Sequence, residues 1–117
     1  MTIKANELFH LLSDDTRLRS LLLMQSEGEL CVCELMHALN TIQPKISRHL
    51  ALLRDAGVVS SRRQGQWVYY QLDPELPEWA REVITQTTWA MGDVSPYAED
   101  RAELASMANR PGAACCA

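Results

Sequence analysis

The run QPKISRHLALLR, which begins at Gln43, constrains the fold of this 117-residue chain more than any other stretch. Its apolar residues recur at i, i+4 and i+7, which places them on one stripe of an α-helix, and Pro44 suits a first helical turn because its missing N–H costs nothing there. The stripe consists of Ile46, Leu50 and Leu53. A shorter helix-forming stretch, residues 31–39, precedes this run across a tight turn. Two helices around a tight turn, the second with a polar outer face, predict a helix-turn-helix.

A β-hairpin is predicted directly after the second helix. Gly57 suits the left-handed residue that closes this helix. The β-rich runs VVSSR and QWVYYQL follow, separated by the turn residues Arg63-Gln64-Gly65. Basic and amide side chains gather at the tip of this hairpin, where a wing contacts the phosphate backbone of DNA. An ordinary solvated hairpin is the alternative interpretation.

The length and the hydrophobic content of 47% allow one domain with one modest core. No apolar run approaches about 18 residues, and charged residues interrupt the N-terminus, so we expect neither a membrane span nor a signal peptide. A cytoplasmic protein is therefore expected. In a reducing compartment, the four cysteines serve as thiolate ligands or redox thiols more readily than as disulfides.

Basic residues concentrate around the predicted helix-turn-helix and hairpin, although the chain carries a net charge of −4. Residues 41–66 hold five basic residues and one acidic residue, whereas the remainder holds six basic and fourteen acidic ones. A basic surface on an acidic body attracts DNA locally, while repulsion elsewhere limits nonspecific affinity. The alternative is a charged face that is simply solvated.

Cys31 and Cys33 stand at the start of the first helix of the predicted pair, where the helix dipole favours thiolates. Thiolates select soft ions. Positions i and i+2 lie about 200° apart around a helix, so both thiols hold one ion only if the first turn unwinds. This geometry indicates a switch, because unwinding that turn would misplace the second helix. The alternative is that two small cysteines fill core space beside Leu30 and Leu35.

The segments ELCVCEL, QPKISRHLALLR and RRQGQWVYYQL resemble, in order and spacing, the arsenic-responsive branch of the ArsR/SmtB winged-helix repressors. The resemblance covers about Glu7 to Trp79. It implies a mainly α fold with a small β-hairpin (α+β), namely a winged helix-turn-helix that forms a homodimer through its N- and C-terminal helices. It also implies a repressor that binds operator DNA without a cofactor. Arsenite or antimonite, bound by Cys31 and Cys33, is then the inducer that releases the DNA.

The docking mode of these repressors assigns side chains to parts of the DNA. Base edges are expected near three side chains and phosphates near four others. The first set is Gln43, Ser47 and His49; the second is Lys45, Arg48, Arg62 and Arg63.

The chain departs from related repressors at the third ligand, since Met36 stands where many of them have a third cysteine. Trivalent arsenic prefers three thiolates, so a donor is missing. The candidates are Cys115 or Cys116 from the C-terminal tail, a small exogenous thiol, or none. His37 lies four residues after Cys33, and a site with this imidazole would suit Zn²⁺ or Cd²⁺ instead.

We expect residues 1–92 to form the winged helix-turn-helix and dimerisation domain, and residues 93–117 a short helix and a flexible tail with two cysteines. A repressor of the same fold that responds to a divalent metal or to thiol oxidation is the first alternative. A thiol oxidoreductase, for instance an arsenate reductase, is a more distant one. The sequence shows no catalytic triad pattern, Gly-rich phosphate loop or paired-carboxylate signature, so we do not expect an enzyme.

Overall fold

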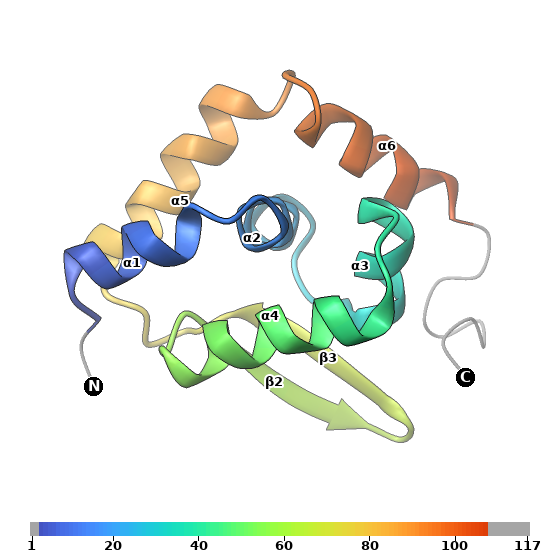
Figure 1. Cartoon of the computed structure of the whole chain (residues 1–117), viewed down its shortest axis with the longest axis horizontal. Coiled ribbons are helices and arrows are strands. Elements are labelled where there is room, and N and C mark those ends of the chain that lie inside the picture. The colour runs from blue at the N-terminus through green and yellow to red at the C-terminus, as the bar shows by residue number, and fades with distance from the viewer. Residues whose placement is uncertain (1–2, 108–117) are drawn as a thin grey trace.

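The computed structural model describes residues 3–107 and shows six helices and three short strands in this part of the chain (Figure 1). The elements are α1 (Ala5–Leu12), α2 (Asp15–Glu27), β1 (Leu30–Cys31), α3 (Val32–Leu39), α4 (Gln43–Asp55), β2 (Val59–Gln64), β3 (Trp67–Leu72), α5 (Glu78–Met91) and α6 (Tyr97–Ser106). Within residues 3–107, no helix has the length and apolar character needed to cross a bilayer.

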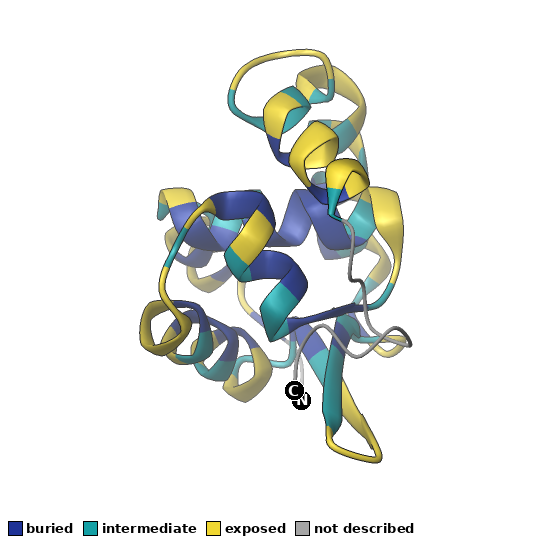
Figure 2. Ribbon diagram, turned by 90° about the vertical axis from the view of Figure 1, so that its right-hand side faces the viewer, coloured by how far each residue is buried: buried dark blue, intermediate teal, exposed yellow. Residues whose placement is uncertain are grey.

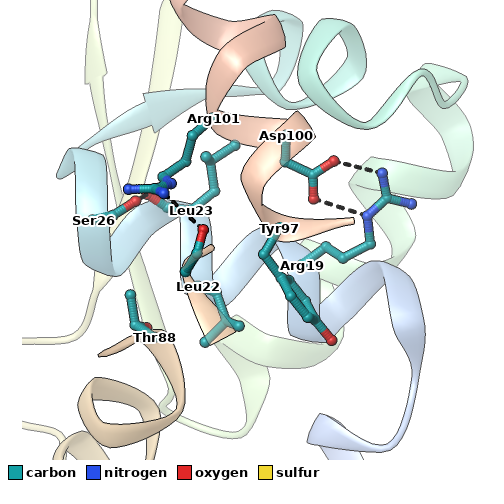
Figure 3. A pocket seen from close by; sticks show the side chains of 9 residues that line it. Arg19, Leu22, Leu23, Ser26, Thr88, Tyr97, Asp100 and Arg101 are labelled. Atoms are coloured by element: carbon teal, nitrogen blue, oxygen red, sulfur yellow. Dashed lines mark hydrogen bonds and ion pairs between the residues drawn. The ribbon is translucent and has the colours of Figure 1, made fainter. Parts of the chain in front are cut away.

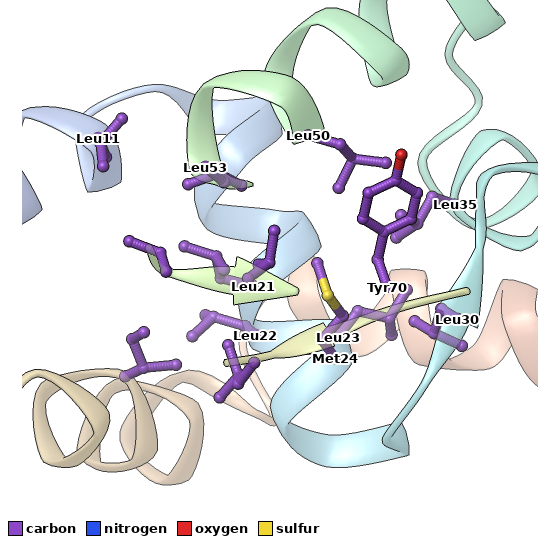
Figure 4. Packing of buried hydrophobic residues seen from close by; sticks show 14 of the residues in the cluster. Leu11, Leu21, Leu22, Leu23, Met24, Leu30, Leu35, Leu50, Leu53 and Tyr70 are labelled. Atoms are coloured by element: carbon purple, nitrogen blue, oxygen red, sulfur yellow. The ribbon is translucent and has the colours of Figure 1, made fainter. Parts of the chain in front are cut away.

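Helix α2 is the central element, around which the other helices and the sheet are arranged (Figure 1). Four consecutive residues of α2, from Leu21 to Met24, are buried, so this turn of the helix is covered on all sides rather than along one stripe. Its N-terminus is capped by the Asp14 side chain, which accepts a hydrogen bond from the Arg17 N–H at 3.0 Å. Figure 4 shows leucines of α2 meeting side chains from the surrounding helices and strands in one core.

The predicted helix-turn-helix is confirmed as α3, a short turn and α4. Asn40 makes the turn with φ of 51°, a left-handed conformation that asparagine tolerates better than most residues. The predicted apolar stripe of α4 is buried throughout: Ile46, Leu50 and Leu53 are each at most 1% exposed. Burial of this stripe fixes which side of α4 faces solvent.

The predicted hairpin is also confirmed, and it belongs to a three-stranded antiparallel sheet of order β1-β3-β2. Its turn was predicted at Arg63-Gln64-Gly65 but lies at Gly65-Gln66, because Arg63 and Gln64 still pair with β3. Gly65 at its turn has φ of 63°, a conformation that favours glycine. Strand β1 was not predicted: residues Leu30 and Cys31 are extended and pair with Tyr70 and Tyr69 of β3. The helix expected from Cys31 therefore begins one residue later, with Cys31 as its N-cap. The hairpin projects from the helical body, and its tip is exposed (Figure 2).

Helix α6 packs against both α2 and α3 (Figures 1 and 3). Leu104 is fully buried and belongs to the same hydrophobic cluster as the core of α2. Asp100 is 3% exposed and accepts two hydrogen bonds from Arg19, one from Nε at 2.9 Å and one from Nη2 at 2.6 Å. These hydrogen bonds are the main reason that the pKa of the Arg19 guanidinium is raised above its ordinary value. Such a two-point pair sets the orientation of α6 on α2.

Candidate DNA-binding surface and thiol site

The solvent-facing side of α4 carries most of the residues expected to contact DNA. Gln43, Lys45 and Arg48 are exposed, and Ser47 is half-buried. Gln43 Nε2 donates a hydrogen bond to Ser47 Oγ at 3.3 Å, so these two polar groups lie side by side one turn apart. Amide and hydroxyl groups on an exposed helix face can read base edges, and the two cations can contact phosphates.

The β2–β3 hairpin, which is the wing of this fold, adds Arg62 and Arg63, both exposed on β2. Arg62 has a protein partner that the sequence did not suggest: it donates two hydrogen bonds to the Glu29 carboxylate, from Nε at 2.6 Å and from Nη2 at 2.7 Å. Its guanidinium also lies 4.8 Å from the centre of the Tyr69 ring. The hydrogen bonds to Glu29 are the main reason that the pKa of Arg62 is raised. The cation is therefore held on the sheet surface, over the strand residue Tyr69 with which Arg62 is paired.

The structure does not place His49 with the other predicted DNA contacts. This side chain is 8% exposed, and its Nδ1 lies 3.2 Å from Arg17 Nη1. An imidazole with so little exposed surface cannot readily contact a base edge, so the predicted base contact of His49 does not fit this arrangement. The sequence did carry the signal, because a residue three positions after Ile46 lies on the buried side of an amphipathic helix.

Arg17 connects α4 to α1. Its Nε donates to the Leu11 carbonyl oxygen at 2.8 Å, while Nη1 faces His49. Since a guanidinium only donates, His49 Nδ1 must accept, which leaves the ring proton on Nε2, 3.7 Å from Asp14 Oδ2. Burial, together with the nearby cations, lowers the pKa of His49, although the Asp14 carboxylate opposes this.

The ionisation of Asp14 fits the same arrangement. Burial alone would raise the pKa of this carboxyl. The hydrogen bond from the Arg17 N–H and the charge of Arg17 act in the opposite direction, and the pKa is lowered. A neutral imidazole between a cation and a carboxylate is the favoured state of this cluster.

The two cysteines lie at the junction between strand β1, which pairs with the wing strand β3, and helix α3 of the helix-turn-helix. Cys31 is 3% exposed and ends β1, while Cys33 is half-buried in the first turn of α3. The Glu34 carboxylate accepts a hydrogen bond from the Cys31 N–H at 2.9 Å, and the Cys31 sulfur faces the N–H of Glu34, which together form a capping box. The two cysteine sulfurs thus sit at the positive end of α3, the helix that leads through a short turn into α4.

The other suggested ligands are placed differently. Met36 is half-buried on α3, and the exposed His37 points Nε2 towards Glu103 Oε2 on α6, at 3.7 Å. No cluster of three or more metal-binding side chains of the His, Cys, Asp or Glu types occurs in the part of the chain that the structure describes. Cys115 and Cys116 lie outside the described residues.

Together, the fold and the exposed face of α4 define a winged helix-turn-helix protein. A sequence profile described as "Bacterial regulatory protein, arsR family" matches residues 14–61, which include α2, α3 and α4. The chain belongs to this arsR family of bacterial regulatory proteins.

Individual relatives agree with this assignment. The chain is 53% identical over 112 residues to the arsenic resistance transcriptional regulator ArsR2 of Pseudomonas putida, covering 94% of this chain and 96% of that protein. Among solved structures, reduced HlyU from Vibrio cholerae superposes with a TM-score of 0.66 at 30% identity, covering 74% of this chain and 86% of that one. The AntR antimony-specific transcriptional repressor gives a TM-score of 0.63 at 25% identity, covering 75% and 77%.

Proposed function

We propose that this protein is a homodimeric transcriptional repressor that binds operator DNA and is released when trivalent arsenic or antimony binds Cys31 and Cys33. The observation that carries the proposal is the position of both cysteines at the N-terminus of α3, the helix that a short turn joins to the recognition helix α4. The 53% identical relative is named as an arsenic resistance regulator, and AntR as antimony-specific, which supports a thiophilic inducer.

DNA binding is assigned to two exposed surfaces. On α4, Gln43 and Ser47 would read base edges, and Lys45 and Arg48 would contact phosphates. Arg62 and Arg63 of the wing would contact the flanking backbone, where basic side chains contribute affinity without reading sequence. His49 is assigned a supporting role inside the protein because it is buried against Arg17.

The switch follows from the strand-to-helix junction at Cys31. Cys31 has the extended backbone of an N-cap residue (φ −89°, ψ 168°), and Cys33 lies in the first helical turn. An ion bound by both thiolates would have to draw the two sulfurs towards one point, which distorts this turn and the Cys31–Glu34 capping box. Because α3 leads into α4, a distorted α3 would present the recognition helix in the wrong place for its base contacts.

A third donor would complete a pyramidal site. The Met36 thioether is a weaker donor than a thiolate, and His37 faces Glu103. A third thiolate would then have to come from Cys115, from Cys116 or from a small thiol in solution. Binding by two thiolates alone remains the alternative for ligands such as aryl arsenicals.

The dimer would bring two recognition helices onto a two-fold symmetric operator. Phe9 of α1 is 54% exposed, and Trp79 and Trp89 of α5 are 39% and 81% exposed. Large apolar side chains on the two helices that related repressors use for dimerisation support this arrangement.

The test is release of a labelled operator duplex by arsenite, antimonite, Zn²⁺, Cd²⁺ or peroxide, for the wild type and for Cys31→Ser and Cys33→Ser. Both variants should bind the operator as the wild type does, since neither thiol is needed on DNA, and neither should be released by arsenite. Release of the wild type by Zn²⁺, Cd²⁺ or peroxide but not by arsenite would instead identify a divalent-metal or redox repressor. If both single variants still responded to arsenite, the sensor would lie elsewhere in the chain.

A further inference from the structure

A row of three residues crosses the sheet from the thiol site to the wing. In the antiparallel register, Cys31 of β1 is paired with Tyr69 of β3, and Tyr69 is paired with Arg62 of β2. Directly paired residues of neighbouring strands project to the same face of a sheet, with their Cβ atoms about 5 Å apart. One face of the sheet therefore carries a thiol, a phenol and a guanidinium in sequence.

Glu29, just before β1, adds a carboxylate to this row. It stands two residues before Cys31, so an extended backbone places both side chains on the same face. Its carboxylate accepts the two hydrogen bonds from Arg62 at 2.6 and 2.7 Å, and the same guanidinium lies over the Tyr69 ring at 4.8 Å. Tyr69, the cross-strand neighbour of Cys31, and Glu29, two residues before it, thus both contact the Arg62 guanidinium of the wing.

We infer that the Glu29–Arg62 pair, with Tyr69 beneath it, couples the thiol site to the wing and makes Arg62 a positioning residue for inducer response. This inference rests on the proposed function, because it requires an inducer at Cys31. Drawing the Cys31 sulfur towards Cys33 moves the Cys31 backbone, which is half of the two-residue strand β1. Strand β1 then loses its register with Tyr69, and Glu29 moves with it.

The two states of this element are a paired and an unpaired β1. In the paired state, Glu29 holds Arg62 on the sheet face, and the wing keeps one geometry relative to α4. In the unpaired state, Arg62 loses its two-point partner, and the wing is released from the segment that leads into α3. The coupling therefore acts on wing contacts, separately from the displacement of α4 itself.

The chain offers a conservative variant and a matched control. Glu29→Gln removes the charge that orients Arg62 while keeping side-chain size. Glu27→Gln makes the same change two residues away, at the exposed C-terminal end of α2. Arg62→Lys keeps a cation for DNA but cannot make two parallel hydrogen bonds to one carboxylate.

The experiment measures the operator dissociation constant by fluorescence anisotropy with and without saturating arsenite, and arsenite binding by the ultraviolet absorbance of thiolate–arsenic bonds. The readout is the ratio of the two operator dissociation constants, which a purely structural effect on DNA affinity leaves unchanged. Glu29→Gln and Arg62→Lys should each lower this ratio at least fivefold while arsenite still binds. The double variant should lose no more than either single one, because both remove the same interaction. Glu27→Gln should keep the wild-type ratio.

The outcomes separate the two proposals. Arsenite binding and a wild-type ratio in Glu29→Gln would overturn the coupling and leave the proposed function standing. Failure of arsenite to bind the wild type, or to release its operator, would overturn the proposed function and this inference with it.

Discussion

At the residue scale, the buried Arg17 and His49, together with the half-buried Asp14, show how a recognition helix is anchored. Arg17 donates to a carbonyl of α1 and to His49 of α4, so one side chain holds two helices in a fixed relation. The imidazole accepts from Arg17 only when neutral at Nδ1. Protonation of His49 would bring an N–H against the guanidinium N–H groups and break this contact.

This arrangement gives stability a pH dependence with a definite sign. The pKa of His49 in the folded protein lies below the unfolded value of about 6.5, because burial and the Arg17 charge disfavour the imidazolium. The unfolded chain therefore binds more protons, and the His49 contribution to stability is complete above about pH 6.5 and is lost as pH falls towards the folded pKa.

His49→Asn should reduce this loss, since the Asn oxygen can still accept from Arg17 but does not titrate. The free energy of unfolding is measured by urea unfolding at a series of pH values from about 7 down to 5. The control is His10→Asn, on the exposed side of α1. An equally steep loss of stability in His49→Asn would show that another group is responsible.

The sequence predicts local features of these residues and misses the distant ones. The period of Ile46, Leu50 and Leu53 predicts the buried side of α4 because helical spacing is a local property. Pairs such as Glu29–Arg62 and Arg19–Asp100, separated by 33 and 81 positions, depend on how the elements pack. No spacing rule reports them, and for the same reason the two-residue strand β1 could not be predicted.

At the element scale, α6 is an additional helix that rests on the helix of the thiol site. It packs on α3 and α2, with Leu104 in the core and Asp100 bonded to Arg19. Figure 3 shows this pair beside Tyr97, which also comes from α6. Leu104 is the one fully buried apolar residue of α6, and Tyr97 is partly buried against the core, so we expect the ion pair to contribute much of the docking of this helix.

Asp100→Asn should therefore loosen α6 without unfolding the rest of the domain. Removing one partner from a buried pair costs about 3–5 kcal/mol, and the value here should fall slightly below this range because Arg19 keeps some access to water. A loss of about 2.7 kcal/mol corresponds to about a hundredfold faster hydrogen exchange of α6 amides.

The matched control is Asp93→Asn, which changes an exposed carboxylate 3.6 Å from Arg101. This exposed pair should contribute less than about 1 kcal/mol. Equal protection of α6 in Asp100→Asn and in the wild type would mean that Leu104 and its apolar neighbours hold the helix without the ion pair.

At the scale of the whole molecule, the proposed dimer predicts that a substitution at the subunit interface changes the oligomeric state and the operator affinity together. Trp79→Asp places a charge on the α5 surface proposed to pair with a second copy, and a buried charge without a partner is strongly unfavourable. The dimer dissociation constant should rise at least tenfold, a loss of about 1.4 kcal/mol or more. Sedimentation at low micromolar concentration should show the 13.2 kDa chain where the wild type sediments as a dimer.

Operator binding should weaken in the same variant, because two linked recognition helices engage a two-fold site more tightly than two separate ones. A duplex with a single half-site should be bound equally by Trp79→Asp and the wild type, since α4 and the wing are unchanged. Ala105→Asp adds the same charge at an exposed position of α6 and should alter neither size nor affinity. Circular dichroism of each variant checks that it is folded. A Trp79→Asp protein that sediments as a dimer and binds the full operator normally would place the subunit interface away from this part of α5.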